Sequence, residues 1–170
     1  MSEKPPLKPP VLMSSSHIVD EFDCGSGALN TYLKRFAYVN NQNGSARTYV
    51  VLRGNRVVGY FTLAAGSVVK MESPERIGKE LANHPVPVIL LARLARHIEE
   101  RSTGLGSALL KEALIQIVHA ADIIGVRAVL AHAKDEKAKS FYLSHGFEPS
   151  PIDPFHLYLL VKDIKKTLEI

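Results

Sequence analysis

The sequence contains very little cysteine and no long apolar run. Cys24 is the only cysteine in 170 residues, so an internal disulfide is excluded. No apolar stretch approaches the roughly 20 residues that a membrane-spanning helix needs. The first ten residues, MSEKPPLKPP, are charged and rich in proline, and they lack the apolar segment of a secretory signal. These absences predict a protein of the reducing cytoplasm that does not enter a membrane.

The charge balance is modestly basic, with a net charge of +4 and a pI of about 9.2. Such an excess suits an anionic partner such as a nucleotide, RNA or an acidic protein, but solubility alone also explains it. The seven histidines are scattered without the spacing of metal ligands. We therefore expect no metal site.

The apolar pattern predicts one α/β domain over residues 14–170, preceded by a short flexible arm over residues 1–13. A helix over 26–39 would bury one apolar face. The residues of that face are Leu29, Leu33, Phe36 and Ala37. The later elements are strands 47–52 and 56–65 around Gly54–Asn55, a helix over 74–82, a strand over 85–95, a helix over 105–121, a strand over 126–133, a helix over 136–145 and a strand over 155–164.

The stretch RSTGLG, residues 101–106, joins a predicted strand to a predicted helix. A helix start presents unpaired N–H groups, and glycine lets an anion approach them. Arg101 adds a cation with several donors. The turn lacks the Lys-Ser/Thr of a P-loop and the third glycine of a dinucleotide fold. It indicates either another kind of phosphate site or a helix start that uses glycine only for close packing.

Two motifs together resemble one family. RSTGLG is similar to the acetyl-CoA signature Arg/Gln-x-x-Gly-x-Gly/Ala of the GCN5-related N-acetyltransferases (GNAT). KDEKAKSFYLSHGF, residues 134–147, resembles the second signature of that family, Asn/Asp-x-x-Ala-x-x-Phe-Tyr-x-x-x-Gly-Phe. The resemblance implies a GNAT fold, which is a mixed central β-sheet flanked by helices, and acetyl-CoA as co-substrate. Phrases along most of the chain, such as PVPVILLARLA, resemble the acetyltransferase toxins of bacterial toxin–antitoxin pairs.

The resemblance assigns roles to individual residues. Tyr142 stands at the family's general-acid position, where a phenol with a pKa of about 10 would protonate the departing thiolate of CoA. Its helical spacing alone would make it a core tyrosine. The backbone of Leu94 and Ala95 is expected beside the pantetheine arm of CoA, although both residues also fit a plain core strand. The other expected acetyl-CoA contacts are Arg101, Ser102, Thr103, Gly104, Leu105, Gly106, Ser107, Asp135 and Phe141. Asp135 fits a helix N-cap equally well.

The toxin resemblance also implies an acceptor and partners. Such toxins acetylate the α-amino group of aminoacyl-tRNA and stop translation. A ribbon-helix-helix antitoxin neutralises them, operator DNA is reached only through that antitoxin, and homodimers are common. The candidates for contact with tRNA are Lys34, Arg35, Arg47, Arg53, Arg56, Arg93 and Arg96, and each of them except Arg93 would otherwise be a solvated charge.

Arg93 is a special case because it lies inside an apolar strand. A cation there needs either a structural ion pair or a place at the edge of a site. No general base is evident, and His132, the one histidine considered for that role, is by default a core or strand residue.

The match departs from the toxin pattern at three positions. Arg96 and His97 stand where the pattern has Val-Asp, and Ser102 replaces a glycine. Two other functions stay open, and these departures support only the second of them. One is acetylation of a small amine or a protein N-terminus, and the other is a non-catalytic module that binds an antitoxin and its operator DNA.

Overall fold

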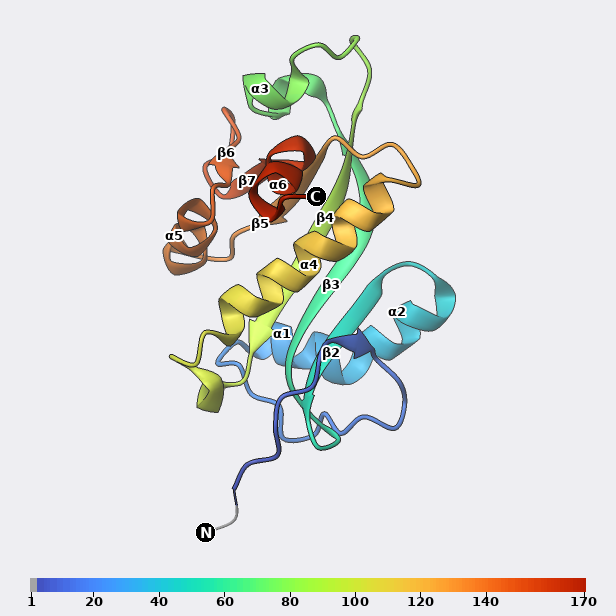
Figure 1. The fold of residues 1–170 in the computed structure, drawn as a ribbon, viewed down its shortest axis with the longest axis vertical. Helices are drawn as coiled ribbons and strands as arrows, with labels where there is room; N and C mark the ends of the chain where they lie inside the picture. The colour runs from blue at the N-terminus through green and yellow to red at the C-terminus, as the bar shows by residue number, and fades with distance from the viewer. Residues whose placement is uncertain (1–2) are drawn as a thin grey trace. The chain divides into compact units, whose positions relative to one another are not determined.

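The computed structural model describes residues 3–170, which form two compact units interleaved along the chain (Figure 1). The first unit comprises the residues up to Ala64 together with Arg93–Ala113, and the second comprises Ala65–Ala92 and Leu114–Ile170. The strands are β1 (Val11–Leu12), β2 (Arg47–Arg53), β3 (Arg56–Val68), β4 (Val86–Arg96), β5 (Ala128–His132), β6 (Glu148–Pro149) and β7 (His156–Leu160). The helices are α1 (Gly27–Thr31), the π-helical η1 (Tyr32–Phe36), α2 (Ala37–Asn43), the 3-10 helix η2 (Lys70–Glu72), α3 (Glu75–Gly78), the 3-10 helix η3 (Ile98–Glu100), α4 (Leu105–Ala121), α5 (Glu136–Ser144) and α6 (Val161–Leu168).

The strands are ordered β1-β2-β3-β4-β5-β7-β6. β4 and β5 are parallel, whereas β2 pairs with β3, and β5 with β7, in antiparallel fashion. The sheet is therefore mixed, which confirms the predicted fold class. One domain over 14–170 stays a prediction.

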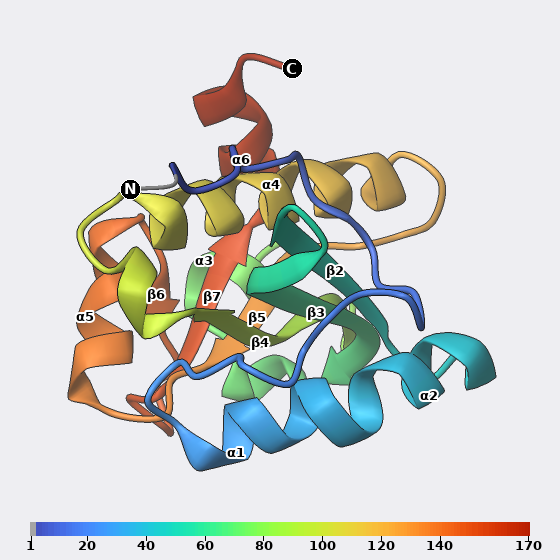
Figure 2. The same cartoon turned by 90° about the horizontal axis from the view of Figure 1, so that it is seen from below.

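In the first unit, the β2–β3 hairpin turns at Gly54, whose φ of +62° favours glycine. Neighbouring residues of β3 face opposite sides of the sheet. The Tyr60 hydroxyl donates a 2.7 Å hydrogen bond to the carbonyl of Leu29 on α1, whereas Gly59 lies against Leu105 and Leu109 of α4. Figure 2 accordingly shows α1 and α2 on one side of this hairpin and the first turns of α4 on the other.

Gly59 lets α4 lie close to β3. A Cβ at this position would stand 3.0 Å from Leu109 Cδ1 and 3.3 Å from Leu105 Cδ2. We expect Gly59→Val to lower the free energy of unfolding by about 2 kcal/mol, because the added carbons overpack this contact. Urea denaturation measures the change. Gly125→Val is the matched control, since a Cβ at Gly125 meets nothing within 4 Å. Equal stability of the two variants would contradict the close contact at Gly59.

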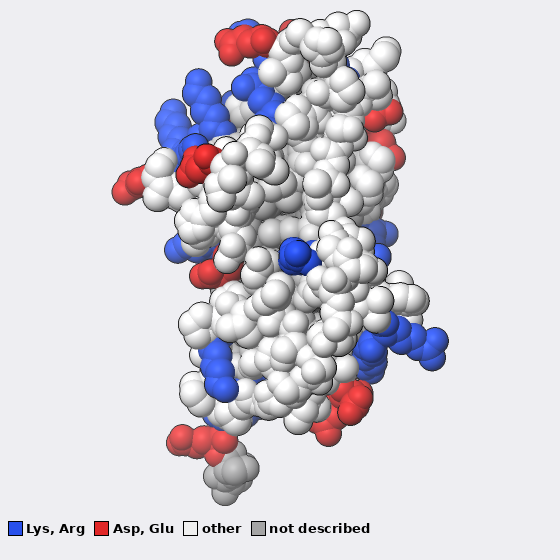
Figure 3. Space-filling view, turned by 90° about the vertical axis from the view of Figure 1, so that its right-hand side faces the viewer, with Lys and Arg blue, Asp and Glu red and all other residues white. Residues whose placement is uncertain are grey.

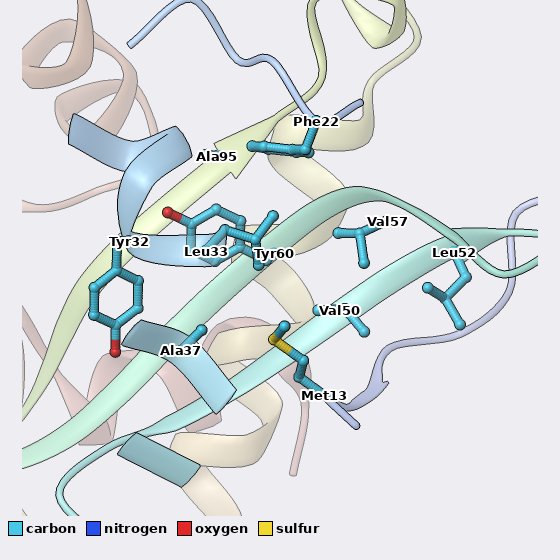
Figure 4. Close-up of a cluster of buried hydrophobic side chains, with 10 residues drawn as sticks. All are labelled: Met13, Phe22, Tyr32, Leu33, Ala37, Val50, Leu52, Val57, Tyr60 and Ala95. Atoms are coloured by element: carbon cyan, nitrogen blue, oxygen red, sulfur yellow. The ribbon is translucent and has the colours of Figure 1, made fainter. Parts of the chain in front are cut away.

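The first long helix differs from its prediction in one important respect. It begins after Ser26, whose hydroxyl caps Leu29 N, and it ends at Gly44, whose φ is +79°. The prediction that Phe36 belongs to the buried face is wrong, because Phe36 is 51% exposed. Leu33 and Ala37 are fully buried (Figure 4). The cause is η1, because the wider turn rotates Phe36 out of the apolar face.

The segment expected to be a flexible arm has backbone hydrogen bonds in the structure. Lys8 N donates to Leu52 O, and Met13 N donates to Thr48 O, both at 3.0 Å. Between them, β1 pairs with β2 through Val11↔Val50. This short strand was not predicted, because two residues are too few to carry a pattern. The flexibility of the segment stays a prediction.

In the second unit, β7 lies between β5 and β6 in the strand order. The predicted final strand over 155–164 is wrong beyond Leu160, where α6 begins. Val161 and Ile164 are buried while Lys162 is exposed. This spacing of buried residues follows the period of a helix. In the sequence, the change from strand to helix is hard to see because the apolar run of β7 continues into Val161.

Candidate functional site

The C-terminal end of β4 extends past its pairing with β5. The registered pairs of the described residues run from Val88↔Ala128 to Leu91↔Ala131, and β4 continues to Arg96. Leu94 and Ala95 therefore lie beyond the paired stretch, in the position expected of backbone that contacts an extended ligand. Ala95 is buried, and Leu94 is half-buried.

Arg93 lies on an aromatic ring. Its guanidinium carbon is 3.6 Å from the ring centroid of Tyr32, a cation–π arrangement. Within residues 3–170, Arg93 forms no salt bridge with a carboxylate. Of the two roles open to this arginine, the structure therefore does not provide the ion pair, and the hydrogen-bond donors on the edge of the guanidinium can serve a ligand.

The RSTGLG turn is held in place by a buried ion pair that sequence reasoning missed. Arg53 Nε and one Glu100 carboxylate oxygen are 2.6 Å apart, and a second hydrogen bond of 3.1 Å joins Arg53 to the other oxygen. The Glu100 side chain is 2% exposed. The Thr103 hydroxyl donates to the carbonyl of Glu100 at 2.7 Å. The ion pair thus connects the β2–β3 hairpin to the start of the turn.

His97, one of the departures from the toxin pattern, has a structural role. Its Nδ1 accepts a 3.0 Å hydrogen bond from Glu99 N and caps η3, and its Nε2 lies 3.1 Å from Glu21 O. These contacts fit the tautomer with the proton on Nε2. The side chain is buried, so His97 supports the segment that leads into the turn.

Within the turn, Gly104 has a φ of +82° and its carbonyl accepts from Ala108 N at the start of α4. Arg101 is exposed. Its guanidinium lies against Gly25, because a Cβ added to Gly25 would be 3.3 Å from Arg101 Nη2. Ser102 also has a positive φ, of +64°. This left-handed conformation explains why a glycine is typical at this position.

Substitutions at Ser102 should follow the backbone conformation. We expect Ser102→Gly to raise the free energy of unfolding by about 0.5 kcal/mol, because relief of the left-handed conformation exceeds the entropy that glycine adds to the unfolded chain. Ser102→Val should lower it by about 1.5 kcal/mol, since a β-branched side chain tolerates this φ poorly. Thermal and urea unfolding measure both. A neutral valine variant would show that residue 102 does not hold a positive φ in solution.

In the second unit, α5 carries the residues of the second motif. The Asp135 carboxylate accepts a 2.8 Å hydrogen bond from Ala138 N, so it caps the helix, and its contact with CoA stays a prediction. Tyr142 is buried between Phe141 and Phe147, with ring centroids 5.4 Å and 5.2 Å away. Burial raises the pKa of Tyr142 to about 12.

His132 is stacked on His156 in the second unit, with ring centroids 4.0 Å apart and planes 12° apart. Partial burial of the ring lowers the pKa of His132, the neighbouring His156 lowers it further, and Asp153 opposes the shift. His132 is the last residue of β5, which fits its default assignment to the strand.

All the basic residues expected to contact tRNA fall in the first unit. Lys34 and Arg35 are exposed on η1, Arg96 is half-buried, and Arg47 is exposed and donates to Asn41 O at 2.6 Å. The molecular face in Figure 3 shows lysines and arginines in small groups among acidic residues. Charge alone therefore does not mark a binding surface on this face.

Two kinds of site were also sought in the part of the chain that the structure describes. Residues 3–170 contain no cluster of three or more histidine, cysteine or acidic side chains suited to a metal ion. None of the described helices is both long and apolar enough to cross a bilayer.

Residues 44–149 match the family described as an acetyltransferase (GNAT) domain. The chain belongs to this family, and the predicted resemblance is confirmed. Among curated relatives, the chain is 44% identical over 156 residues to the tRNA-acetylating toxin of Mycobacterium tuberculosis (strain ATCC 25618 / H37Rv), which covers 92% of this chain and 93% of that protein.

Solved structures of two other proteins are also similar. A tyrosine-to-phenylalanine mutant of KacT gives a TM-score of 0.89 at 25% identity, over 97% of this chain and 99% of that one. AtaT complexed with acetyl-methionyl-tRNAfMet gives a TM-score of 0.89 at 25% identity, over 96% and 99% of the two chains. An AtaT tyrosine-to-phenylalanine mutant bound to acetyl-CoA and the C-terminus of the antitoxin AtaR gives 0.83 at 25% identity, over 96% and 99%.

Proposed function

We propose that this chain transfers the acetyl group of acetyl-CoA to the α-amino group of aminoacyl-tRNA and thereby stops translation. The observation that carries the proposal is its similarity, along 92% of its length, to a relative named as a tRNA-acetylating toxin. The geometry of the RSTGLG turn, with Gly104 at a positive φ, supports use of the acetyl-CoA signature.

The reaction exchanges a thioester for an amide. The neutral amine attacks the thioester carbonyl carbon, the C–N bond forms, the C–S bond breaks, and the amine nitrogen loses a proton to water. Backbone N–H groups at Leu94 and Ala95 would stabilise the carbonyl oxygen as negative charge develops on it. The Tyr142 phenol would donate its proton to the leaving thiolate and regain one from water.

Each unit carries residues that are proposed, from the family motifs, to contact acetyl-CoA. The backbone of Ser102, Thr103 and Gly104, and the first turn of α4 over Leu105–Ser107, would bind the pyrophosphate with Arg101. Asp135 and Phe141 would contact CoA from α5. Because Asp135 also caps that helix, its role here is secondary to its structural one.

The acceptor would be bound by cations of the first unit. Arg93 fits the edge of a binding site, because its guanidinium is fixed on Tyr32 and forms no salt bridge within the described residues. Lys34, Arg35, Arg47 and Arg96 would contact tRNA phosphates, which makes binding salt-dependent.

We further propose a ribbon-helix-helix antitoxin as partner, contact with operator DNA only through that antitoxin, a homodimer, and a cytoplasmic location. The complex of AtaT with the C-terminus of AtaR supports an antitoxin partner of some type. Co-purification with the product of a neighbouring gene, followed by light scattering, would test the complex and its stoichiometry.

The deciding experiment incubates the full chain with radiolabelled acetyl-CoA and total charged tRNA. We expect label on aminoacyl-tRNA, released by mild base as N-acetyl amino acid. A parallel panel of free amines and peptides tests the small-amine alternative, which label there and not on tRNA would favour. No transfer to any acceptor would favour the non-catalytic module.

A further inference from the structure

The π-helical turn η1 exposes an aromatic ring beside two cations. Phe36, its last residue, is 51% exposed, and the adjoining Lys34 and Arg35 are exposed as well. Within residues 3–170, neither cation forms a salt bridge. Burying a phenylalanine side chain stabilises a folded protein by about 1.5–3 kcal/mol. The exposed Phe36 ring lacks much of this stabilisation, which a regular α-helix is expected to provide by turning the ring toward the core.

The exposed ring stands on a fixed base. Its neighbour Tyr32 is buried, and the two ring centroids are 6.4 Å apart with planes inclined by 31°. Asn40 Nδ2 donates to the Tyr32 hydroxyl at 3.2 Å, and the Tyr60 ring is stacked at 6.4 Å. Arg93 covers the Tyr32 ring at 3.6 Å. The turn is therefore held from the core side, and Phe36 is presented by an ordered support (Figure 4 shows Tyr32 and Tyr60).

Asp23, a carboxylate whose charge interacts with Lys34, already accepts hydrogen bonds from other groups. The Asp23 carboxylate accepts from Gly25 N at 2.9 Å and from Asn30 Nδ2 at 3.1 Å. These two hydrogen bonds, with a smaller effect of Lys34, lower the pKa of Asp23. The positive charge of Lys34 and Arg35 thus remains available to a partner from solution.

We propose that Phe36 stacks on an unpaired base at the 3′ end of the tRNA acceptor, with Lys34 and Arg35 holding the adjacent phosphates. Single-stranded nucleic acids are bound by this combination of aromatic face and basic side chains, whereas a paired stem offers no open base face. The flanking cations favour RNA over an apolar peptide segment. The inference rests on the proposed function, because it names the part of aminoacyl-tRNA that this surface binds.

The test measures binding of the full chain to two fluorescent RNA minihelices, one with unpaired 3′ nucleotides and one blunt. Phe36→Ala should raise the Kd for the overhanging RNA about tenfold and leave the blunt RNA unchanged. Phe36→Trp should restore binding, because it keeps a stacking face. Val39→Ala is the matched control, since Val39 is 52% exposed and lies one turn further along α2. Lys34→Gln and Arg35→Gln should each reduce the slope of log Kd against the logarithm of the salt concentration by about 0.7.

Equal Kd values of Phe36→Ala and wild type for the overhanging RNA would overturn the inference, as would an equal loss on both RNAs. Loss of self-association or of antitoxin binding, with RNA binding intact, would assign the surface to a protein partner and overturn it too. These results are distinct from failure of the proposed function, which is absence of label on aminoacyl-tRNA from the wild-type protein.

Discussion

Tyr142→Phe is expected to lower kcat for acetyl transfer by about 10²–10³-fold while the fold stays intact. The substitution removes the proton donor for the leaving thiolate but keeps the ring that packs between Phe141 and Phe147. Single-turnover transfer from acetyl-CoA to aminoacyl-tRNA measures the effect. Tyr158→Phe is the matched control, because Tyr158 is also a buried tyrosine and burial likewise raises its pKa to about 12. A Tyr142→Phe variant as fast as wild type would remove this residue from the mechanism.

The pH profile gives a second check on Tyr142. Its pKa, raised to about 12 by burial, keeps the phenol protonated throughout the physiological range. The transfer rate should therefore rise with pH as the acceptor amine loses its proton, and then level off without an alkaline decline below about pH 10. A decline centred near pH 8 or 9 would indicate a different acid.

Arg53→Met is expected to lower the free energy of unfolding by about 3 kcal/mol at pH 7, because it leaves the Glu100 carboxylate buried without its partner. The double variant Arg53→Met/Glu100→Leu should recover most of this loss, since no buried charge then remains. Urea denaturation of the wild type and the two variants measures the cycle. An equal loss in the single and double variants would contradict an ion-pair origin.

Lowering the pH should reduce the difference in the free energy of unfolding between wild type and Arg53→Met. Hydrogen bonding to Arg53 lowers the pKa of Glu100 below its ordinary value of 4.5. A lowered pKa contributes stability above the unfolded value, and the contribution is lost as pH falls toward the folded value. Wild type should therefore lose stability more steeply than Arg53→Met below about pH 4.5.

Arg53→Met should also weaken acetyl-CoA binding, because Glu100 positions the turn.

Local signals were sufficient for the elements that carry the family motifs. α4 spans residues 105–121 as predicted, because its apolar residues recur at helical spacing and glycines precede it. α5 begins after Asp135 and ends before Gly146, since the cap and the positive φ of that glycine are encoded locally. The resemblance to GNAT acetyltransferases rested on these segments, so the fold class followed from them.

Features set by distant contacts did not emerge from the sequence. Glu100 looked like one of several acids, and only the approach of Arg53, 47 residues earlier, makes it a buried partner. Phe36 fitted the apolar face of a regular helix, and no residue in the segment signalled the π turn that exposes it. The two-residue strands β1 and β6 exist because longer strands lie beside them.

The position of β7 affects how the protein can be made. β7 pairs with β5 on one edge and with β6 on the other, yet it follows both of them in the sequence. Leu159 of this strand also contacts the region of Gly146, directly after the helix that carries Tyr142. A ribosome that synthesises this chain has therefore made β5, α5 and β6 before the strand that joins β5 to β6 exists. A fragment that ends before His156 would lack the strand between β5 and β6, and with it the contact of Leu159 beside Gly146.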